Sequence, residues 1–295
     1  MAAAGSIDGK TVFITGGARG VGEEVARRLH ARGARLVLTD LDEPPLAALR
    51  DRLGAERVHT VTADVRDLSA MEAAAAGAID RFGGIDVVMA NAGIASYGSV
   101  LQVDPQAFRT LMDVNVLGVF HTVRATLPSV LERRGYVLIV SSLAAYAAAP
   151  GLAPYNATKA AVEHFANALR LEVGYRGVDV GSAHMSWIDT PLVRDTRADL
   201  PTFTEMISRL PFPLNRTTSV EACGAAFVSG IEKRNRQINS PGWVGLMRWL
   251  KPVLSTPIGE TPVLKFVPDL LPRMDAEVAA LGRSMGTRTK DLEDR

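Results

Sequence analysis

The sequence predicts an α/β protein built on a doubly wound parallel sheet, in a single domain with a C-terminal extension. Over the first two thirds of the 295 residues, short apolar runs alternate with stretches of helical periodicity. This alternation implies parallel strands joined by crossover helices. The runs are apolar almost throughout, as strands are when helices cover both faces of a sheet. A glycine cluster after the first run marks the first strand–helix turn.

Six strands and five helices are expected in the order of the pattern. The strands are expected at residues 11–15, 35–39, 58–63, 86–89, 136–141 and 178–183. The helices are expected at residues 21–32, 45–53, 69–82, 105–131 and 155–175. In the first helix Val21, Val25 and Leu29 recur every four residues and therefore share one face.

Composition and charge exclude several classes of protein. Lys and Arg number 33 against 32 Asp and Glu, so no basic excess favours nucleic acid as a partner. Cys223 is the only cysteine and the five histidines show no metal-ligand spacing, so neither an intrachain disulfide nor a metal site is expected. The first ten residues lack the pattern of a secretory signal, and no run of about 18 apolar residues occurs. We expect a cytoplasmic protein.

The first strand–helix turn reads Thr15-Gly16-Gly17-Ala18-Arg19-Gly20-Val21-Gly22. Its glycines allow a tight turn and a close approach of the backbone to a phosphate. The helix that begins near Gly20 directs free N–H groups and its positive dipole end at that point. The spacing differs from the general dinucleotide fingerprint, and a plain glycine-rich turn is the alternative. The position between a strand and a helix favours a dinucleotide cofactor.

Asp40 follows the second expected strand and lies 18 residues after Gly22. A carboxylate there can accept hydrogen bonds from an adenosine ribose and repels a 2′-phosphate, which favours NAD over NADP. Arg19 favours the opposite choice, because its guanidinium could bind a phosphate. We expect Asp40 to decide, since it lies beside the ribose hydroxyls; a turn or capping carboxylate is the alternative.

Tyr155 and Lys159 stand four residues apart at the start of an expected helix, so they share one face. Free tyrosine has a pKa of about 10, and a nearby ammonium lowers that pKa by favouring the phenolate. The pair therefore suits proton transfer to or from a substrate oxygen near neutral pH. Ser142 lies 13 residues before Tyr155, at the carboxyl end of the fifth strand, where ligands bind in such sheets. Its hydroxyl could hold that oxygen, and Ser141 is the competitor.

The chain resembles the short-chain dehydrogenase/reductase family over about residues 8–235. The matching residues occur in order: Thr15-Gly16-x-x-x-Gly20-x-Gly22, Asp64-Val65, Asn91-Ala92-Gly93, Asn115, Ser142 and Tyr155-x-x-x-Lys159. The resemblance implies a Rossmann-type fold and hydride transfer on a nicotinamide, in an enzyme acting on CH–OH groups. It implies that Ser142 orients the substrate, Tyr155 exchanges the proton, and Lys159 holds the ribose and lowers the pKa of Tyr155.

The resemblance also implies the remaining site residues. Asn115 would bend its helix and anchor a water in the proton relay, Asp64 would touch adenine, and Asn91 would line the cofactor. The expected cofactor-binding residues are Gly16, Ala18, Arg19, Gly20, Val21, Asp40, Asp64, Val65, Asn91, Ala92, Gly93, Tyr155, Lys159, Ile188 and Thr190. NAD is the expected cofactor, with NADP as the alternative.

The chain departs from the family pattern at Ala90, where the family often has Asn before Asn91-Ala92-Gly93, and in one longer segment. Met185-Ser186 replaces the usual Pro-Gly after the sixth strand, so the shape of the nicotinamide half-site is open. Ile188 and Thr190 still match the residues that hold the nicotinamide carboxamide. His184 is expected to be structural rather than catalytic, because the acid/base is already supplied.

The expected substrate pocket is apolar. Its candidate residues are Leu143, Ala144, Ala145, Leu152, Met185, Trp187 and the apolar side chains of 191–215. They favour a lipophilic secondary alcohol or ketone as substrate; simple packing within a lid is the alternative. An NADPH-dependent carbonyl reductase and a non-catalytic NAD-binding sensor are the competing functions, and the intact Ser142, Tyr155 and Lys159 disfavour the sensor.

We expect a catalytic domain over residues 1–240, with a substrate lid at about 190–220, and a helical extension over 241–295. The helical stretches 105–131 and 155–175 resemble the family's oligomer helices, so a homodimer or homotetramer is expected. In the extension the residues Trp243, Leu246, Met247 and Leu250 recur at helical spacing near basic residues. Such a stripe can lie on an anionic membrane, but packing against its own protein or a dimer mate is favoured.

Overall fold

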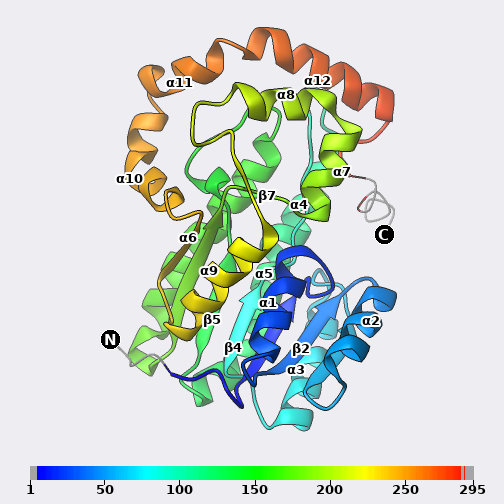
Figure 1. Ribbon diagram of the computed structural model, residues 1–295, viewed down its shortest axis with the longest axis vertical. Helices are drawn as coiled ribbons and strands as arrows, with labels where there is room; N and C mark the ends of the chain where they lie inside the picture. The colour runs from blue at the N-terminus through cyan, green and yellow to red at the C-terminus, as the bar shows by residue number, and fades with distance from the viewer. Residues whose placement is uncertain (1–4, 287–288, 290–295) are drawn as a thin grey trace.

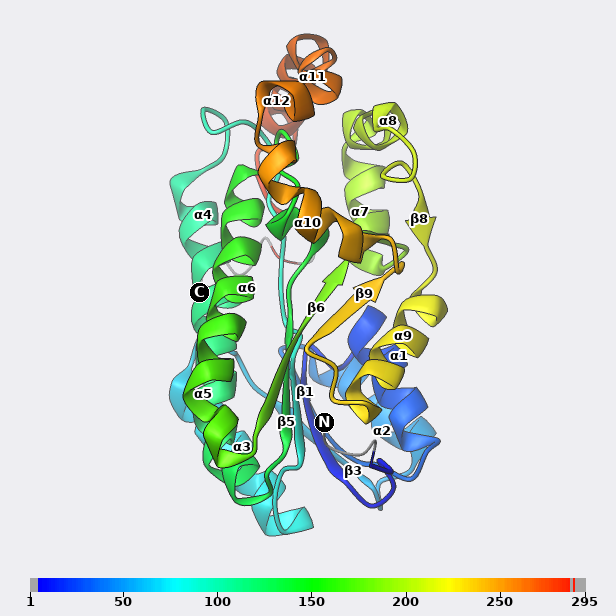
Figure 2. The same cartoon turned by 90° about the vertical axis from the view of Figure 1, so that its left-hand side faces the viewer.

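The computed structural model describes residues 5–286 and 289 and shows a seven-stranded parallel sheet between two layers of helices (Figures 1 and 2). The strands are β1 (Thr11–Thr15), β2 (Arg35–Asp40), β3 (Val58–Thr62), β4 (Val87–Ala90), β5 (Tyr136–Val140), β6 (Asp179–Met185) and β9 (Gln237–Ser240). Their order across the sheet is β3-β2-β1-β4-β5-β6-β9. The winding reverses between β1 and β4, which confirms the predicted Rossmann-type fold class.

The register of the parallel strands brings their carboxyl ends to one edge of the sheet. Thr15 pairs with Thr39 in β2, Ile14 pairs with Met89 in β4, and Val140 pairs with Ala183 in β6. The segments that follow these strands therefore emerge side by side, at the edge where ligands bind in open α/β sheets.

Helices cover both faces of the sheet (Figure 2). One layer holds α1 (Gly20–His30), α2 (Glu43–Leu53) and α9 (Val220–Glu232), and the other holds α3 (Leu68–Phe82), α4 (Pro105–Met112), α5 (Gly118–Glu132) and α6 (Ala153–Val173). Strand side chains alternate between two cores: Phe13 and Val88 pack toward the α3–α5–α6 layer, and Ile14 and Leu38 pack toward the α1–α2–α9 layer. The apolar runs in the sequence follow from this two-sided burial.

The predicted strands and helices occur within two residues of their expected bounds, with one difference; strand β9 and helix α9 were not predicted. The stretch predicted as one helix over 105–131 is divided by a π-helical turn at Asp113–Leu117 (η1) between α4 and α5. The strand β9 was missed because only one of its faces is fully buried, so Gln237 and Asn239 alternate with buried residues instead of forming an apolar run.

A second group of elements lies beyond the carboxyl ends of the strands (Figure 1). It comprises α7 (Pro191–Asp199), α8 (Pro201–Arg209), the short parallel pair β7 (Trp187–Ile188) and β8 (Thr217–Thr218), and the arc of α10 (Val244–Leu254), α11 (Pro257–Leu264) and α12 (Val267–Leu281). Two 3-10 turns, η2 (Leu143–Ala145) and η3 (Gly174–Arg176), complete the described elements. Buried Phe203 and Met206 of α8 share one apolar cluster with Leu270 and Met274 of α12. The C-terminal arc is therefore joined to the segment that follows β7.

Among the described residues, one helical stretch, Pro105–Glu132, is long and apolar enough to cross a membrane by length and composition. Half of its most apolar window is buried inside the protein. The α5 part packs on β4, β5 and α3, as a helix of a sheet cover does.

Candidate active site

A cavity of about 910 Å³ lies at the carboxyl ends of the strands, where β1 and β4 diverge. One part is lined by the glycine-rich turn and the segments after β2, β3 and β4, and another part by residues of η2, α7, α8 and α11. The predicted catalytic and cofactor-binding residues all line this cavity except Ala18 and Asn115. Of the six substrate-pocket residues predicted by name, only Ala145 does not line it, because Ala145 packs in a buried cluster with Val244 and Met247. Sequence positions as distant as Gly16 and Thr190 are thus brought together in one site.

The glycine-rich turn leaves the start of α1 open. Arg19, the N-cap residue, makes no side-chain cap hydrogen bond, so within the described residues the first N–H groups of α1 keep their capacity for an anion. Gly16 and Gly20 adopt φ of 63° and 56°, which favour glycine. Asn91 holds the turn, because its Nδ2 donates to the carbonyl oxygens of Thr15 and Gly16 at 2.9 and 3.0 Å. This arrangement fits the pyrophosphate of a dinucleotide.

Asp40 lies beside this turn, and its Oδ2 accepts a hydrogen bond from the Ala18 N–H at 3.1 Å. Burial raises the pKa of the Asp40 carboxyl, and the Ala18 and Asp42 backbone N–H groups oppose that rise. Arg19 forms an ion pair with Asp42. The guanidinium that could have favoured a 2′-phosphate is therefore already held by a carboxylate next to Asp40.

Asp64 and Val65 border the same half of the cavity. The carboxylate of Asp64 accepts hydrogen bonds from the backbone N–H and the Nε of Arg66, both at 2.9 Å. The Val65 carbonyl lies 3.0 Å from His121 Nδ1. These contacts fix the segment after β3, where the adenine end of a dinucleotide would lie.

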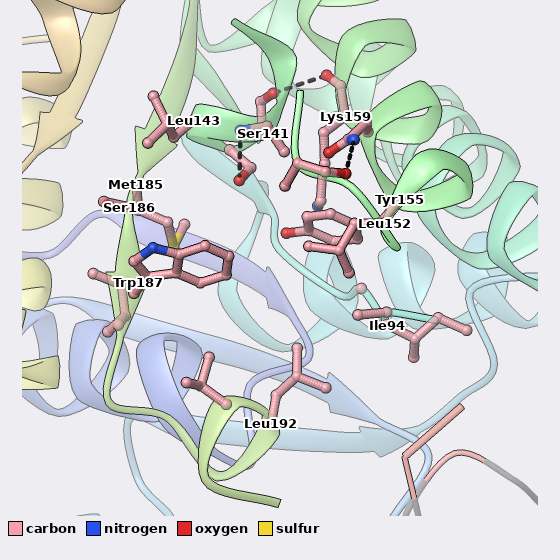
Figure 3. Close-up of a pocket in the computed structure, with 18 of the residues that line it drawn as sticks. Ile94, Ser141, Leu143, Leu152, Tyr155, Lys159, Met185, Ser186, Trp187 and Leu192 are labelled. Carbon is pink, nitrogen blue, oxygen red and sulfur yellow. Dashed lines mark hydrogen bonds between the residues drawn. The ribbon is translucent and has the colours of Figure 1, made fainter. Parts of the chain in front are cut away.

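Lys159 is buried beneath the cavity floor (Figure 3). Its Nζ donates to the Val140 carbonyl at 3.1 Å and lies 5.6 Å from the centroid of the Tyr155 ring. Burial lowers the pKa of Lys159 from 10.5 to about 8. A Cβ on Gly93 would lie 3.3 Å from that Nζ, so only glycine leaves the ammonium accessible from this side.

Tyr155 points its hydroxyl into the cavity, toward Trp187 (Figure 3). Burial raises the pKa of Tyr155, and a hydrogen bond with Ser142 opposes that rise. The sequence-based expectation was that Lys159 would lower this pKa. Burial of the Tyr155 phenol instead outweighs the opposing effect of Ser142, so the pKa of Tyr155 lies above its ordinary value.

The two neighbouring serines have different roles. Ser141 Oγ donates to the Lys159 carbonyl at 2.8 Å, which ties β5 to α6. Ser142 Oγ accepts from the Ala144 N–H at 3.1 Å, and Ser142 lies close enough to the Tyr155 phenol to oppose the rise in its pKa. The hydroxyl that shares the site with Tyr155 is thus that of Ser142.

Asn115 lies in the π-helical turn and is completely buried. Its Nδ2 donates to the Ile94 carbonyl at 2.9 Å and to Thr158 Oγ1 at 3.0 Å, and its Oδ1 accepts from the Ile94 N–H at 2.8 Å. The side chain therefore links the segment after β4 to α6, and the helix departs from α geometry where Asn115 stands.

The Met185-Ser186 segment lies where a nicotinamide would be expected. The Ser186 N–H donates to the Ser240 carbonyl at 3.0 Å, which joins this segment to the end of β9. Its hydroxyl is buried and has no hydrogen-bond partner within the described part of the chain. Ile188 lies in β7, and Thr190 Oγ1 accepts from the Val193 N–H at 3.4 Å to cap α7.

His184 is completely buried behind Ser142. Its Nδ1 lies 3.2 Å from the Ser142 carbonyl, and its Nε2 lies 2.8 Å from the Tyr146 hydroxyl. Burial lowers the pKa of His184 from 6.5 to about 4, so the ring is neutral at neutral pH. The ring lies outside the cavity lining, as expected for a structural residue, but it contacts the segment that carries Ser142.

Sequence reasoning did not find the contribution of the C-terminal arc to the site. Leu254, Gly259, Val263 and Val267, from α10 to α12, line the cavity together with Ile94, which was also not singled out. No local pattern marks these residues, because α10 and α11 reach the cavity only through the folding of the whole arc over the sheet.

Comparison with known proteins agrees with this geometry. The short chain dehydrogenase family model matches residues 10–201. An uncharacterized NAD-dependent oxidoreductase of Mycobacterium tuberculosis is 34% identical over 220 residues, covering 68% of this chain and 79% of its own. The 11-beta-hydroxysteroid dehydrogenase of Pinus massoniana is 31% identical over 247 residues, covering 80% of this chain and 68% of its own.

A solved structure also resembles this fold. The 3-ketoacyl-(acyl-carrier-protein) reductase from Brucella melitensis complexed with NADH superposes with a TM-score of 0.71 at 26% identity, covering 79% of this chain and 97% of the other. The chain belongs to the short-chain dehydrogenase/reductase family. It is an oxidoreductase that acts on CH–OH donors and uses a nicotinamide cofactor.

Proposed function

We propose that this protein is an NAD-linked enzyme that interconverts a lipophilic secondary alcohol and its ketone. The observation that supports this most directly is the continuity of one cavity. Its polar part holds the open start of α1 and Asp40, and its apolar part lies under α7, α8 and α11. The Tyr155 hydroxyl points into the space between them (Figure 3).

The proposed chemistry assigns a role to each side chain. When bound, the nicotinamide cofactor supplies the hydride acceptor or donor. The Ser142 hydroxyl holds the substrate oxygen through a hydrogen bond and orients its carbon. Tyr155 gives a proton to that oxygen during ketone reduction and removes one during alcohol oxidation. Lys159 hydrogen-bonds the ribose and stabilises the phenolate of Tyr155 by its charge.

The protonation of Tyr155 suits proton exchange with the substrate oxygen in both directions. The raised pKa of Tyr155 keeps it a phenol in the protein alone, which is the form that donates a proton. The Ser142 hydrogen bond and the Lys159 ammonium favour the phenolate that alcohol oxidation needs. Asn115 connects Ile94 to Thr158, and so holds the segment after β4 against the helix that carries Tyr155 and Lys159.

The apolar walls support the substrate class. The substrate side of the cavity is formed mainly by aliphatic and aromatic side chains: Ile94, Leu143, Leu152, Trp187, Leu192, Phe203, Leu214, Val263 and Val267. Apolar walls favour a ligand by removing its surface from water, at roughly 25 cal/mol per Å².

Asp40 supports NAD as the cofactor over NADP. Its carboxylate borders the cavity, and the nearby Arg19 is paired with Asp42. The carboxylates of Asp40 and Asp42 would repel the 2′-phosphate of NADP, and Arg19 is not free to bind it.

We further propose a catalytic unit over residues 1–240, with 190–220 as its lid and the C-terminal extension as its roof. A homodimer or homotetramer would use α4, η1, α5 and α6, whose exposed apolar side chains include Phe108, Leu117, Phe120 and Leu171. Light scattering of the purified protein tests the assembly.

The test of function is NADH formation from NAD⁺ across a panel of lipophilic secondary alcohols, with Tyr155→Phe run beside the parent. We expect turnover with at least one of them and a loss of about 100-fold or more in the variant, with NAD affinity retained. Faster turnover of sugars than of every lipophilic alcohol would overturn the substrate class. Full turnover by Tyr155→Phe would overturn the assignment of the acid/base.

A further inference from the structure

Three aromatic rings, which we call the aromatic row, lie along one side of the cavity: Trp187, Phe203 and Tyr97. The ring of Trp187 lies edge-to-face against Phe203, with centroids 5.4 Å apart and an interplanar angle of 87°. Phe203 meets Tyr97 in the same way, at 5.5 Å and 68°. Tyr155 and Trp187 both pack against the apolar cluster that contains Phe203 and Tyr97. The aromatic row therefore adjoins the proposed acid/base.

Hydrogen bonds hold the two ends of the aromatic row. The indole Nε1 of Trp187 donates to the Leu214 carbonyl at 2.9 Å, and the Tyr97 hydroxyl is hydrogen-bonded to the Thr196 hydroxyl. Phe203 lies between them and is 2% exposed. None of the three rings can turn without losing a hydrogen bond or its packing, so a ligand meets a wall that is already formed.

The indole of Trp187 is the part of the row that a ligand can reach beside the reacting group. It extends from β7 toward the Tyr155 hydroxyl (Figure 3). Trp187 is only partly buried and lines the cavity, whereas Phe203 and Tyr97 are buried. Because its nitrogen is engaged with Leu214, the indole offers a ligand its π-surface and carbon edges. A substrate whose oxygen is hydrogen-bonded to Tyr155 would place its neighbouring groups against this ring.

We propose that Trp187 makes the site selective for alcohols and ketones that carry a flat, unsaturated ring near the reacting carbon. This selectivity rests on the proposed function, because it concerns the same substrate. Aromatic rings attract one another in offset or edge-to-face arrangements beyond the effect of burial, and a saturated ring does not. Burial alone gives the opposite order, because a saturated ring has more apolar surface than a flat ring with the same number of carbons.

The test is the binding of 4-phenylbutan-2-one and 4-cyclohexylbutan-2-one to the full-length protein saturated with NAD⁺, measured by calorimetry. A ketone cannot be reduced by the oxidised cofactor, so binding is measured without turnover. We expect the phenyl ketone to bind about 2- to 10-fold more tightly than the cyclohexyl ketone. Trp187→Leu should remove this preference, and Trp187→Phe should retain part of it. The matched control is Trp249→Leu, at a tryptophan of α10 that is 76% exposed, and it should keep the preference in full.

Urea unfolding checks that each variant is folded. Tighter binding of the cyclohexyl ketone to the parent would overturn the proposal, as would binding of neither ketone or an undiminished preference in folded Trp187→Leu. Oxidation of lipophilic alcohols without a preference for the phenyl ketone would overturn the ring selectivity and leave the proposed function standing. A preference for the phenyl ketone without NADH formation from any alcohol would do the reverse.

Discussion

The imidazole Nδ1 of His184 lies 3.2 Å from the main-chain oxygen of Ser142. A carbonyl only accepts, so Nδ1 must carry the proton and Nε2 must accept, from Tyr146 at 2.8 Å or from Ser182 at 3.0 Å. The ring also stacks on Tyr146, with centroids 4.4 Å apart. A buried neutral histidine thus holds the backbone of the residue whose hydroxyl faces Tyr155.

Because each nitrogen of His184 has its own hydrogen-bond partner, two substitutions should distinguish the role of the Nδ1 contact from that of the Nε2 contact. His184→Asn keeps a donor near the Nδ1 position, whereas His184→Gln keeps a polar group near Nε2 and loses the bond to Ser142. We expect His184→Gln to lower kcat by about 10- to 100-fold, because misplacement of a positioned group by about 1 Å has that effect. His184→Asn should retain most of kcat, and NAD affinity should be unchanged in both. Equal kcat values in the two variants would show that the Ser142 contact does not position the hydroxyl.

The buried, neutral His184 should also make the folded protein less stable in acid. Its pKa is lowered from 6.5 to about 4 by burial, so the folded protein binds this proton less readily than the unfolded chain. The contribution to stability is present above pH 6.5 and is lost as the pH falls toward 4, by roughly 3 kcal/mol at most. Urea unfolding at a series of pH values should show a shallower decline in that window for His184→Asn than for the parent. Parallel pH profiles would contradict the assignment.

Asp40→Ala should reduce the preference for NAD over NADP. The variant loses hydrogen bonds between a charged acceptor and the ribose, each worth about 1.5–3 kcal/mol, so NAD affinity should fall by about 10-fold or more. Adding Asp42→Ala should raise NADP affinity further, because it releases Arg19 from its ion pair. Fluorescence titration gives both dissociation constants, with Asp42→Ala alone measured beside the double variant to separate the two contributions. An unchanged ratio in Asp40→Ala would end this explanation of cofactor choice.

Gly22→Ala should weaken both the fold and cofactor binding. A Cβ at this position would overlap the Gly16 carbonyl oxygen and lie 2.9 Å from Asn91 Nδ2, so the turn must shift. Overpacking of this kind destabilises by about 1–3 kcal/mol, and NAD affinity should fall with it. Gly174→Ala is the matched control, since nothing lies within 4 Å of the added methyl group. Unfolding and NAD titrations that match the parent would show that the turn tolerates the methyl group.

Met274→Ala should loosen the roof of the cavity. Met274 is buried between α12 and α8, and its Sδ lies close to Gly151, next to the cavity-lining Pro150 and Leu152. The loss should be about 2–5 kcal/mol of unfolding free energy, with a raised KM for a lipophilic substrate. The exposed Leu101, changed to alanine, serves as the control. A KM equal to that of the parent, despite lower stability, would separate the roof from substrate binding.

Much of the fold and site could be predicted because local rules determine them. Two-sided burial makes each inner strand an apolar run, and a helix places Tyr155 and Lys159 on one face through their spacing alone. β9 escaped prediction, since only one of its faces is fully buried and Gln237 and Asn239 interrupt the apolar pattern. The π-helical turn at Asn115 also escaped, because it depends on partners in other segments, Ile94 and Thr158.

The sequence by itself determined the sheet, the end of the sheet at which ligands bind, and the chemical groups placed there, because periodicity and short spacing fix which residues share a face. Only the tertiary structure decided among neighbours with the same chemistry. It directed Ser141 to the Lys159 carbonyl and left Ser142 to Tyr155, and it paired Arg19 with Asp42. It also placed the C-terminal arc over the cavity. These outcomes depend on contacts between residues far apart in the chain, whose geometry no local pattern carries.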